Sequence, residues 1–94
     1  MDETGLENQC VSHAIDHGGT SLKCDKIIRS WPDRAFFCPG GVLFFVEFKL
    51  PGEKPRPQQW ARIKLLRTLG FHVHVVTDFD RFKLLLASHL SPGV

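Results

Sequence analysis

The most informative part of the sequence is residues 34–49, which read RAFFCPGGVLFFVEFK. Residues 34–38 have the composition of a β-strand, and the Pro-Gly-Gly segment at residues 39–41 supplies a turn. Residues 42–49 are mostly β-branched or aromatic and are apolar on both faces over most of their length. A strand covered on both faces belongs in the middle of a sheet with helices packed on it. This stretch therefore predicts a β-hairpin whose second strand is central.

The segments on either side of the hairpin predict the remaining elements. These are a helix over residues 4–17, a strand over 22–28, a helix over 58–69, a strand over 71–76 and a helix over 78–90. The first helix opens with a Thr4–Glu7 capping box, Asp78 caps the last, and residues 91–94 form a loose tail. We expect an α/β fold with a mixed sheet covered by helices, in the order α-β-β-β-α-β-α.

Length and composition exclude several classes of protein. A chain of 94 residues suits one domain over residues 1–94, and 43% hydrophobic and 23% charged residues are typical of a globular protein. No apolar run approaches the roughly 18–20 residues of a membrane helix. The first twenty residues carry no Lys or Arg, unlike a secretory signal, and three cysteines without a CxxC pair indicate neither disulfides nor zinc. We expect a soluble intracellular protein with buried cysteines.

Basic residues are concentrated in one part of the chain. The formal net charge is +2, yet residues 49–67 hold six basic residues and one acidic residue, a local balance of +5. Such a segment fits either a phosphate-rich partner or an ordinary solvated helix. If the partner is DNA, the side chains expected to contact its backbone are those of Lys54, Arg56, Arg62, Lys64 and Arg67.

Three charged residues stand at one end of the otherwise apolar hairpin. Glu47 and Lys49 are two residues apart on a strand, so their side chains point to the same face. Asp33 stands at the start of the preceding strand. If the turn is centred on Gly40, Asp33 and Glu47 are near cross-strand neighbours, about 5 Å apart at Cβ or on the adjacent diagonal.

Two carboxylates at that distance repel each other unless a positive charge lies between them. Mg²⁺ is a natural candidate because it binds carboxylates, water and backbone carbonyls such as that of Phe48. Lys49 beside the ion can stabilise charge developing on a phosphate or help to orient an attacking water. The set predicts metal-assisted phosphodiester hydrolysis. The structural alternative is that Asp33 caps a turn and that Glu47 and Lys49 form an ordinary ion pair.

Two further polar residues fall on apolar helix faces. Gln59 shares a stripe with Ile63 and Leu66, and Glu7 lines up with Cys10. Separate structural roles are open to each, Gln59 as a first-turn helix residue and Glu7 as the capping-box acid. One shared site explains all five polar residues more simply than five separate roles.

These residues together resemble a known family. Residues 31–34 (WPDR), the Pro-Gly-Gly turn, residues 45–49 (FVEFK), Gln59 and Gly70 are similar to the VRR-NUC domain, the virus-type replication-repair nuclease. That family belongs to the PD-(D/E)xK nuclease superfamily. The resemblance covers about residues 6–77. It implies a restriction-endonuclease-like core of the stand-alone phage or bacterial type.

The resemblance also implies roles for individual residues. The residues it implies for the catalytic site are Asp33, Glu47, Lys49, Gln59 and Glu7. Among them Asp33 and Glu47 bind the metal, helped by the backbone carbonyl of Phe48, and Lys49 serves the attacking water. Gln59 and Glu7 complete the site, and Glu7 is a further candidate metal ligand.

One position departs from the family's pattern. Ser30 stands two residues before Pro32, where the family commonly has a glycine. We expect this change to reshape the entry to the site and to leave the metal ligands unaffected.

The predicted function is a Mg²⁺- or Mn²⁺-dependent, structure-specific DNA endonuclease of replication, repair or recombination. The resemblance implies that it acts in the cytoplasm of a bacterium or a phage-infected host, and that four-way (Holliday) junctions are a candidate substrate. Cutting two strands of a junction requires two sites, so we expect a homodimer with Phe36, Phe79 or Phe82 at its interface. Two alternatives stay open: a non-catalytic DNA-binding module of the same fold, and a small interaction protein that uses an aromatic surface.

Overall fold

The computed structural model describes residues 2–91 and contains the elements expected from the sequence, in the expected order. They are α1 (Glu3–Asp16), β1 (Thr20–Lys23), β2 (Arg34–Cys38), β3 (Val42–Phe48), α2 (Pro57–Thr68), β4 (His72–Val76) and α3 (Phe79–Leu90). The strands form one sheet in the order β1-β2-β3-β4. β2 pairs antiparallel with β1 and with β3, whereas β4 pairs parallel to β3, so the sheet is mixed as predicted.

The hairpin between β2 and β3 has the predicted register. Its ladder runs from Cys38 opposite Val42, beside the turn, to Arg34 opposite Val46 at the far end. The turn glycines have φ angles of 82° and 73°, a left-handed backbone that glycine adopts without steric cost. Because β4 pairs with the other edge of β3, this strand lies in the interior of the sheet, as its apolar sequence predicts.

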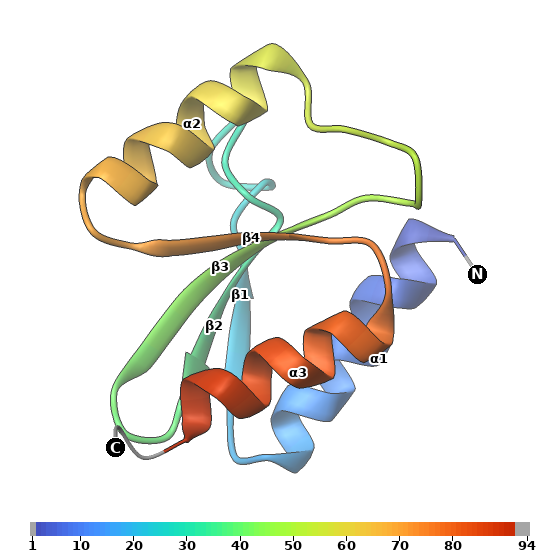
Figure 1. The fold of residues 1–94 in the computed structure, drawn as a ribbon, viewed down its shortest axis with the longest axis vertical. Helices are drawn as coiled ribbons and strands as arrows, with labels where there is room; N and C mark the ends of the chain where they lie inside the picture. The colour runs from blue at the N-terminus through green and yellow to red at the C-terminus, as the bar shows by residue number, and fades with distance from the viewer. Residues whose placement is uncertain (1, 92–94) are drawn as a thin grey trace.

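Helices cover both faces of the sheet, with α1 and α3 on one face and α2 on the other (Figure 1). Alternate residues of each strand therefore enter two separate cores. The core on the α1–α3 side includes the phenylalanines Phe36, Phe44, Phe48 and Phe82. The core on the α2 side is formed by Cys24, Ala35, Phe45, Ile63, Leu66 and Val73. All three cysteines are buried and free, as expected.

The connection between β1 and β2 differs from the prediction. β1 ends at Lys23, so the strand expected over residues 22–28 is wrong beyond that point. The carbonyl of Cys24 accepts the N–H groups of both Ile27 (3.0 Å) and Ile28 (2.9 Å), which turns the chain away from the sheet. Ile27 is 68% exposed, because the turn places its side chain in solvent instead of in either core.

The predicted N-terminal cap is confirmed for α3 but is wrong for α1. Asp78 caps α3 as predicted, by accepting a hydrogen bond from the N–H of Arg81 (2.8 Å). At α1 the predicted capping box is wrong, because Asp2 caps the helix through the N–H of Gly5 (2.7 Å). Glu7 therefore lies inside the helix with its carboxylate available for other contacts.

Two of the three residues expected at a dimer interface lie in the core instead. Phe36 and Phe82 are fully buried, with their ring centroids 5.0 Å apart. Phe79 is partly buried and packs against the same core. The expectation fails for Phe36 and Phe82 because α1 and α3 cover the face of the hairpin to which Phe36 points.

Of the tail predicted over residues 91–94, all but Ser91 lies outside the described residues. Within residues 2–91, no helix combines the length and the apolar character needed to cross a membrane.

Candidate active site

Asp33 and Glu47 meet at one end of the hairpin, as the sequence predicts. Asp33 directly precedes β2. Because Arg34 pairs with Val46, the same register sets Asp33 opposite Glu47. The Oδ2 atom of Asp33 accepts a hydrogen bond from the N–H of Phe48 (2.8 Å). This bond holds the Asp33 carboxylate at the end of β3, beside Glu47.

Glu47 is a buried carboxylate whose hydrogen bonding is incomplete. The side chain is only 2% exposed. Its Oε2 atom accepts a hydrogen bond from Gln59 Nε2 (2.9 Å) and lies 3.6 Å from Lys49 Nζ, whereas Oε1 is buried without a partner. Burial, and next the charge of Asp33, raise the pKa of Glu47 to about 7. An unpartnered buried carboxylate oxygen is costly, so its persistence indicates a position that receives a ligand.

A second aspartate lies beside Asp33. Burial is the main cause that raises the pKa of Asp33 to about 6, and the Phe48 N–H opposes it. Hydrogen bonding to Asp25, and the charge of Asp25, raise this pKa further. Asp25 also has a buried oxygen, Oδ1, that accepts no hydrogen bond, although Lys23 Nζ lies 3.7 Å from it. Asp25 was not among the predicted site residues because the sequence pattern favours a strand there, whereas the turn that follows β1 brings it to the site.

Gln59 connects α2 to the buried carboxylate, as its place on the apolar stripe predicts. Its Oε1 atom accepts the N–H of Arg56 (2.8 Å), and its Nε2 atom donates to Glu47. The same amide therefore fixes the first turn of α2 and orients Glu47. On the other side, the N–H of Lys49 donates to the carbonyl of Val76 (3.0 Å), which extends the pairing of β3 with β4 up to the site.

Glu7 approaches the site from α1 but is held by two cations. Its Oε2 atom accepts hydrogen bonds from Arg34 Nε (2.5 Å) and Lys23 Nζ (2.8 Å). Arg34 also donates to Ser21 Oγ (3.0 Å), so this group ties α1 to β1 and β2. The charge of Glu7 is the last among the causes that raise the pKa of Asp33, after burial and Asp25.

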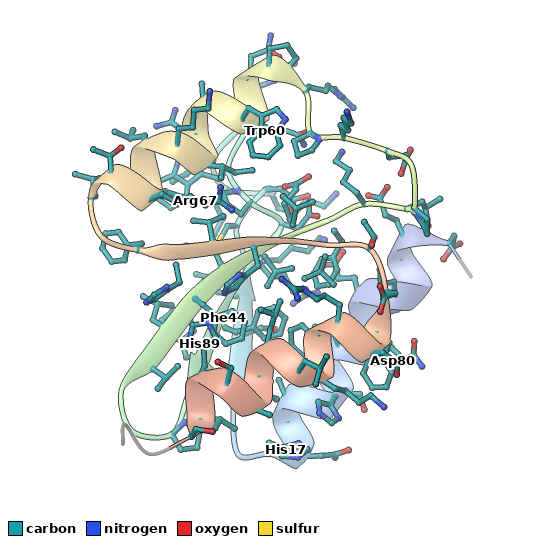
Figure 2. The ribbon with its side chains drawn as sticks, viewed as in Figure 1. His17, Phe44, Trp60, Arg67, Asp80 and His89 are labelled. Carbon is teal, nitrogen blue, oxygen red and sulfur yellow. The ribbon has the colours of Figure 1, made fainter. Side chains whose placement is uncertain are left out.

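The basic residues predicted from the segment around α2 have different surroundings. Lys54, Arg56 and Lys64 are exposed, and the Arg62 guanidinium lies 5.9 Å from the centre of the Trp31 ring. Arg67 lies between α2 and β4 (Figure 2), where its Nε and Nη2 atoms donate to the carbonyl of Val73 (3.1 and 2.7 Å). Arg67 therefore joins two elements of the fold, a contact that the charge pattern could not reveal.

The donor set of the site is made of oxygen atoms. Within residues 2–91, no three His, Cys, Asp or Glu side chains converge as a metal-binding group. Two carboxylates with an unpartnered buried oxygen, next to the backbone of Phe48, nevertheless suit an ion such as Mg²⁺, which takes one or two carboxylates and completes its shell with water and substrate phosphate. The residues present therefore fit a divalent cation of this class.

Comparisons with known proteins found a similar protein sequence and a similar solved structure. No family model matches the sequence. The chain is 37% identical over 86 residues to "Putative nuclease p44" of Acyrthosiphon pisum secondary endosymbiont phage 1, a match that covers 90% of this chain and 92% of that protein. A solved structure described as a VRR_NUC domain is similar with a TM-score of 0.84 and 27% sequence identity, covering 95% of this chain and 97% of that one.

Proposed function

The chain belongs to the VRR-NUC family of nucleases, and from this membership we propose that it is a metal-dependent, structure-specific endonuclease that hydrolyses phosphodiester bonds in DNA. The observation that carries the metal-dependent chemistry is the buried Oε1 atom of Glu47, which has no partner beside a second carboxylate. A protein that only bound DNA would gain nothing from two carboxylates next to phosphates. Replication, repair and recombination are the processes such an enzyme would serve.

The proposed metal ligands are the carboxylates of Asp33 and Glu47 and the backbone carbonyl of Phe48. A bound Mg²⁺ or Mn²⁺ would neutralise negative charge on the phosphate and acidify a water molecule. The Phe48 N–H holds Asp33 in place, and the Gln59 amide holds Glu47, so both ligands are oriented before substrate arrives. Both ions accept such oxygen ligands.

The remaining side chains have roles that follow from their positions. Lys49 Nζ, 3.6 Å from Glu47 Oε2, is placed to orient the attacking water and to stabilise the charge that develops on the phosphate. Glu7 adds negative charge near Asp33, and its ion pairs with Arg34 and Lys23 keep it in position. Glu7 is thus assigned a supporting role in the site.

The basic side chains Lys54, Arg56, Arg62 and Lys64 are proposed to contact the DNA backbone, which positions a duplex without reading its sequence. For a four-way junction, one chain supplies one site, so a symmetric homodimer is proposed to cut two strands. The apolar side chains available for its interface include Leu22 and Phe37, which are 49% and 43% exposed on the β1–β2 part of the sheet.

A cleavage assay tests the proposal. Labelled four-way junction, flap and duplex DNA are incubated with Mg²⁺, Mn²⁺ or EDTA. We expect cleavage only with a divalent ion, and its loss, by at least about a hundredfold, in Glu47→Gln and Lys49→Ala. Asp80→Asn serves as the matched control, because Asp80 lies on the exposed side of α3 (Figure 2). Cleavage that survives both site variants unchanged contradicts the assignment, and salt-sensitive binding without cleavage indicates the non-catalytic module.

A further inference from the structure

A polar cavity lies next to the proposed active site. It has a volume of about 510 Å³ and is lined by Arg29, Ser30, Arg56, Gln58 and Gln59. The first two residues belong to the connection between β1 and β2, and the others to the start of α2. Gln59 is also the residue that donates to Glu47 Oε2. Gln59 therefore both lines the cavity and contacts the buried carboxylate of Glu47.

The lining of this cavity is suited to an anion. Two arginines from separate segments of the chain, Arg29 and Arg56, line it, and no acidic residue does. Neither arginine takes part in an ion pair among residues 2–91. Ser30 and Gln58 add neutral hydrogen-bonding groups. Guanidinium groups bind phosphate oxygens in a bidentate manner, so paired arginines without acidic partners favour a phosphate ligand.

The backbone at the rim of the cavity is unusual. Ser30 has a φ angle of 69° and is the one non-glycine residue within residues 2–91 with a left-handed backbone. This conformation is sterically unfavourable for any residue with a Cβ atom, and such strain tends to be kept at functional sites. The side chain of Ser30 adds a hydroxyl group to the lining of the cavity.

We propose that this cavity binds a backbone phosphate of the DNA strand next to the phosphate that is cleaved. The inference rests on the proposed nuclease function, because that function makes DNA the ligand of the neighbouring site. The volume falls within the range of roughly 300–1,000 Å³ typical of ligand pockets, which is large enough for the sugar attached to the phosphate. Arg29 and Ser30 thus join Arg56 as DNA-contacting residues, although neither was predicted from the charge pattern.

Binding measurements test the cavity without requiring cleavage. Labelled duplex and four-way junction DNA are titrated with protein in EDTA, and fluorescence anisotropy is followed at several salt concentrations. We expect Arg29→Ala to weaken binding about five- to tenfold and to lower the slope of log K against log salt by about one, since one phosphate contact is lost. Arg29→Lys should keep the slope and recover only part of the affinity, because lysine cannot bind in a bidentate manner.

The control variant is Arg81→Ala, which removes an exposed arginine on α3 that does not line the cavity. It should leave binding within about twofold of the wild type. If Arg29→Ala behaves as Arg81→Ala does, the cavity proposal is wrong, even when the wild type cleaves DNA. If binding depends on Arg29 but no divalent ion supports cleavage, the nuclease proposal fails and the phosphate site stands. Circular dichroism of each variant confirms that a loss of binding is not a loss of fold.

Discussion

At the residue scale, Glu47 shows a conflict between stability and function. Its carboxylate is almost completely buried, faces Asp33 and keeps one oxygen without a partner. Such an arrangement destabilises the metal-free protein, because desolvation of a charged group is not repaid in full by the Gln59 hydrogen bond and the Lys49 ammonium. The site is therefore expected to limit the stability of the fold until a cation is bound.

Replacing Glu47 by glutamine tests this conflict. At neutral pH we expect the metal-free Glu47→Gln variant to be more stable than the wild type, by about 1–3 kcal/mol, because a buried charge and its repulsion with Asp33 are removed. Added Mg²⁺ or Mn²⁺ should stabilise only the wild type, since ligands that bind the native state raise its unfolding free energy. Urea unfolding with and without metal measures both effects. A variant that is less stable than the wild type and still responds to metal contradicts the assignment.

Ser30 offers a second test at this scale. Its left-handed backbone is expected to destabilise the fold by about 1–2 kcal/mol. Glycine adopts this backbone without that cost but loses more chain entropy on folding. Ser30→Gly should therefore raise the unfolding free energy by up to about 1 kcal/mol, whereas Ser30→Val should lower it by more than about 1 kcal/mol. Chemical denaturation of the three proteins compares them. A destabilised Ser30→Gly would mean that contacts of the hydroxyl outweigh the backbone strain.

At the element scale, α2 is held to the sheet at both of its ends. Gln59 bonds to Glu47 near its start, and Arg67 bonds to the Val73 carbonyl near its end. Between these points Ile63 and Leu66 fill the smaller core. Hydrogen bonds therefore join α2 to the sheet both where Gln59 meets Glu47 and at the far end of the helix.

Removal of that anchor gives a prediction about α2. Arg67→Ala should lower the unfolding free energy by about 1–2 kcal/mol, because two charge-assisted hydrogen bonds to Val73 are lost. Lys64 lies one helical turn earlier and makes no side-chain hydrogen bond or ion pair among residues 2–91, so Lys64→Ala should change stability by less than about 0.5 kcal/mol. Urea unfolding compares the two variants, and DNA binding measured alongside should be weakened more by Lys64→Ala than by Arg67→Ala. The reverse pattern would mean that Arg67 contacts DNA.

The contact between β4 and α3 predicts a dependence on pH. Burial, and next the charge of His89, lower the pKa of His74 to about 4, and their Nε2 atoms lie 2.9 Å apart. His89 stacks on Phe44 (Figure 2), with ring centroids 4.4 Å apart. Because the folded pKa of His74 lies below the unfolded value of 6.5, the unfolded chain binds more protons between these two values. Stability should therefore fall as pH falls from about 6.5 to about 4.

The unfolding free energies of His74→Gln and of the wild type, measured between about pH 4 and pH 6.5, test this prediction. The variant should lose less stability on acidification than the wild type does, because the ring that resists protonation is gone. His17→Gln, which removes an exposed imidazole, is the control and should follow the wild type. Equal slopes for His74→Gln and the wild type would show that His74 stays accessible to protons in the folded state.

At the scale of the whole molecule, the sequence predicts what depends on local spacing. The register of the hairpin, and with it the meeting of Asp33 and Glu47, follows from the two-residue period of strands and the position of the turn. Contacts between distant segments were not predictable in this way. Asp25 reaches Asp33 only because the connection folds back after β1, and Phe36 is hidden only because α1 and α3 cover its face.

The proposed homodimer also concerns the whole molecule, because it requires an exposed apolar surface. Leu22 and Phe37 are exposed on the same face of the sheet as Ala35, beyond the part that α2 covers. If this surface forms the interface, Phe37→Lys should shift the protein to monomers and abolish paired cuts in a junction, since a buried lysine lacks a partner. Leu84→Lys changes a leucine that is 68% exposed on α3 and should leave the dimer intact. Size-exclusion chromatography with light scattering measures the oligomeric state of each variant. A dimeric Phe37→Lys variant contradicts this interface.

The pairing of β3 with β4 also bears on how the protein folds. The hairpin partners of β3 are close in sequence, but its parallel partner is distant, with Phe44 opposite His72 across the whole of α2. Local pairing has the smaller loop-closure entropy and should form early, and the crossover later. With this order of events, we expect the Glu47 carboxylate to stay hydrated until the crossover brings Gln59 to it with α2. We therefore expect the contact that completes the candidate active site to be among the last to form during folding.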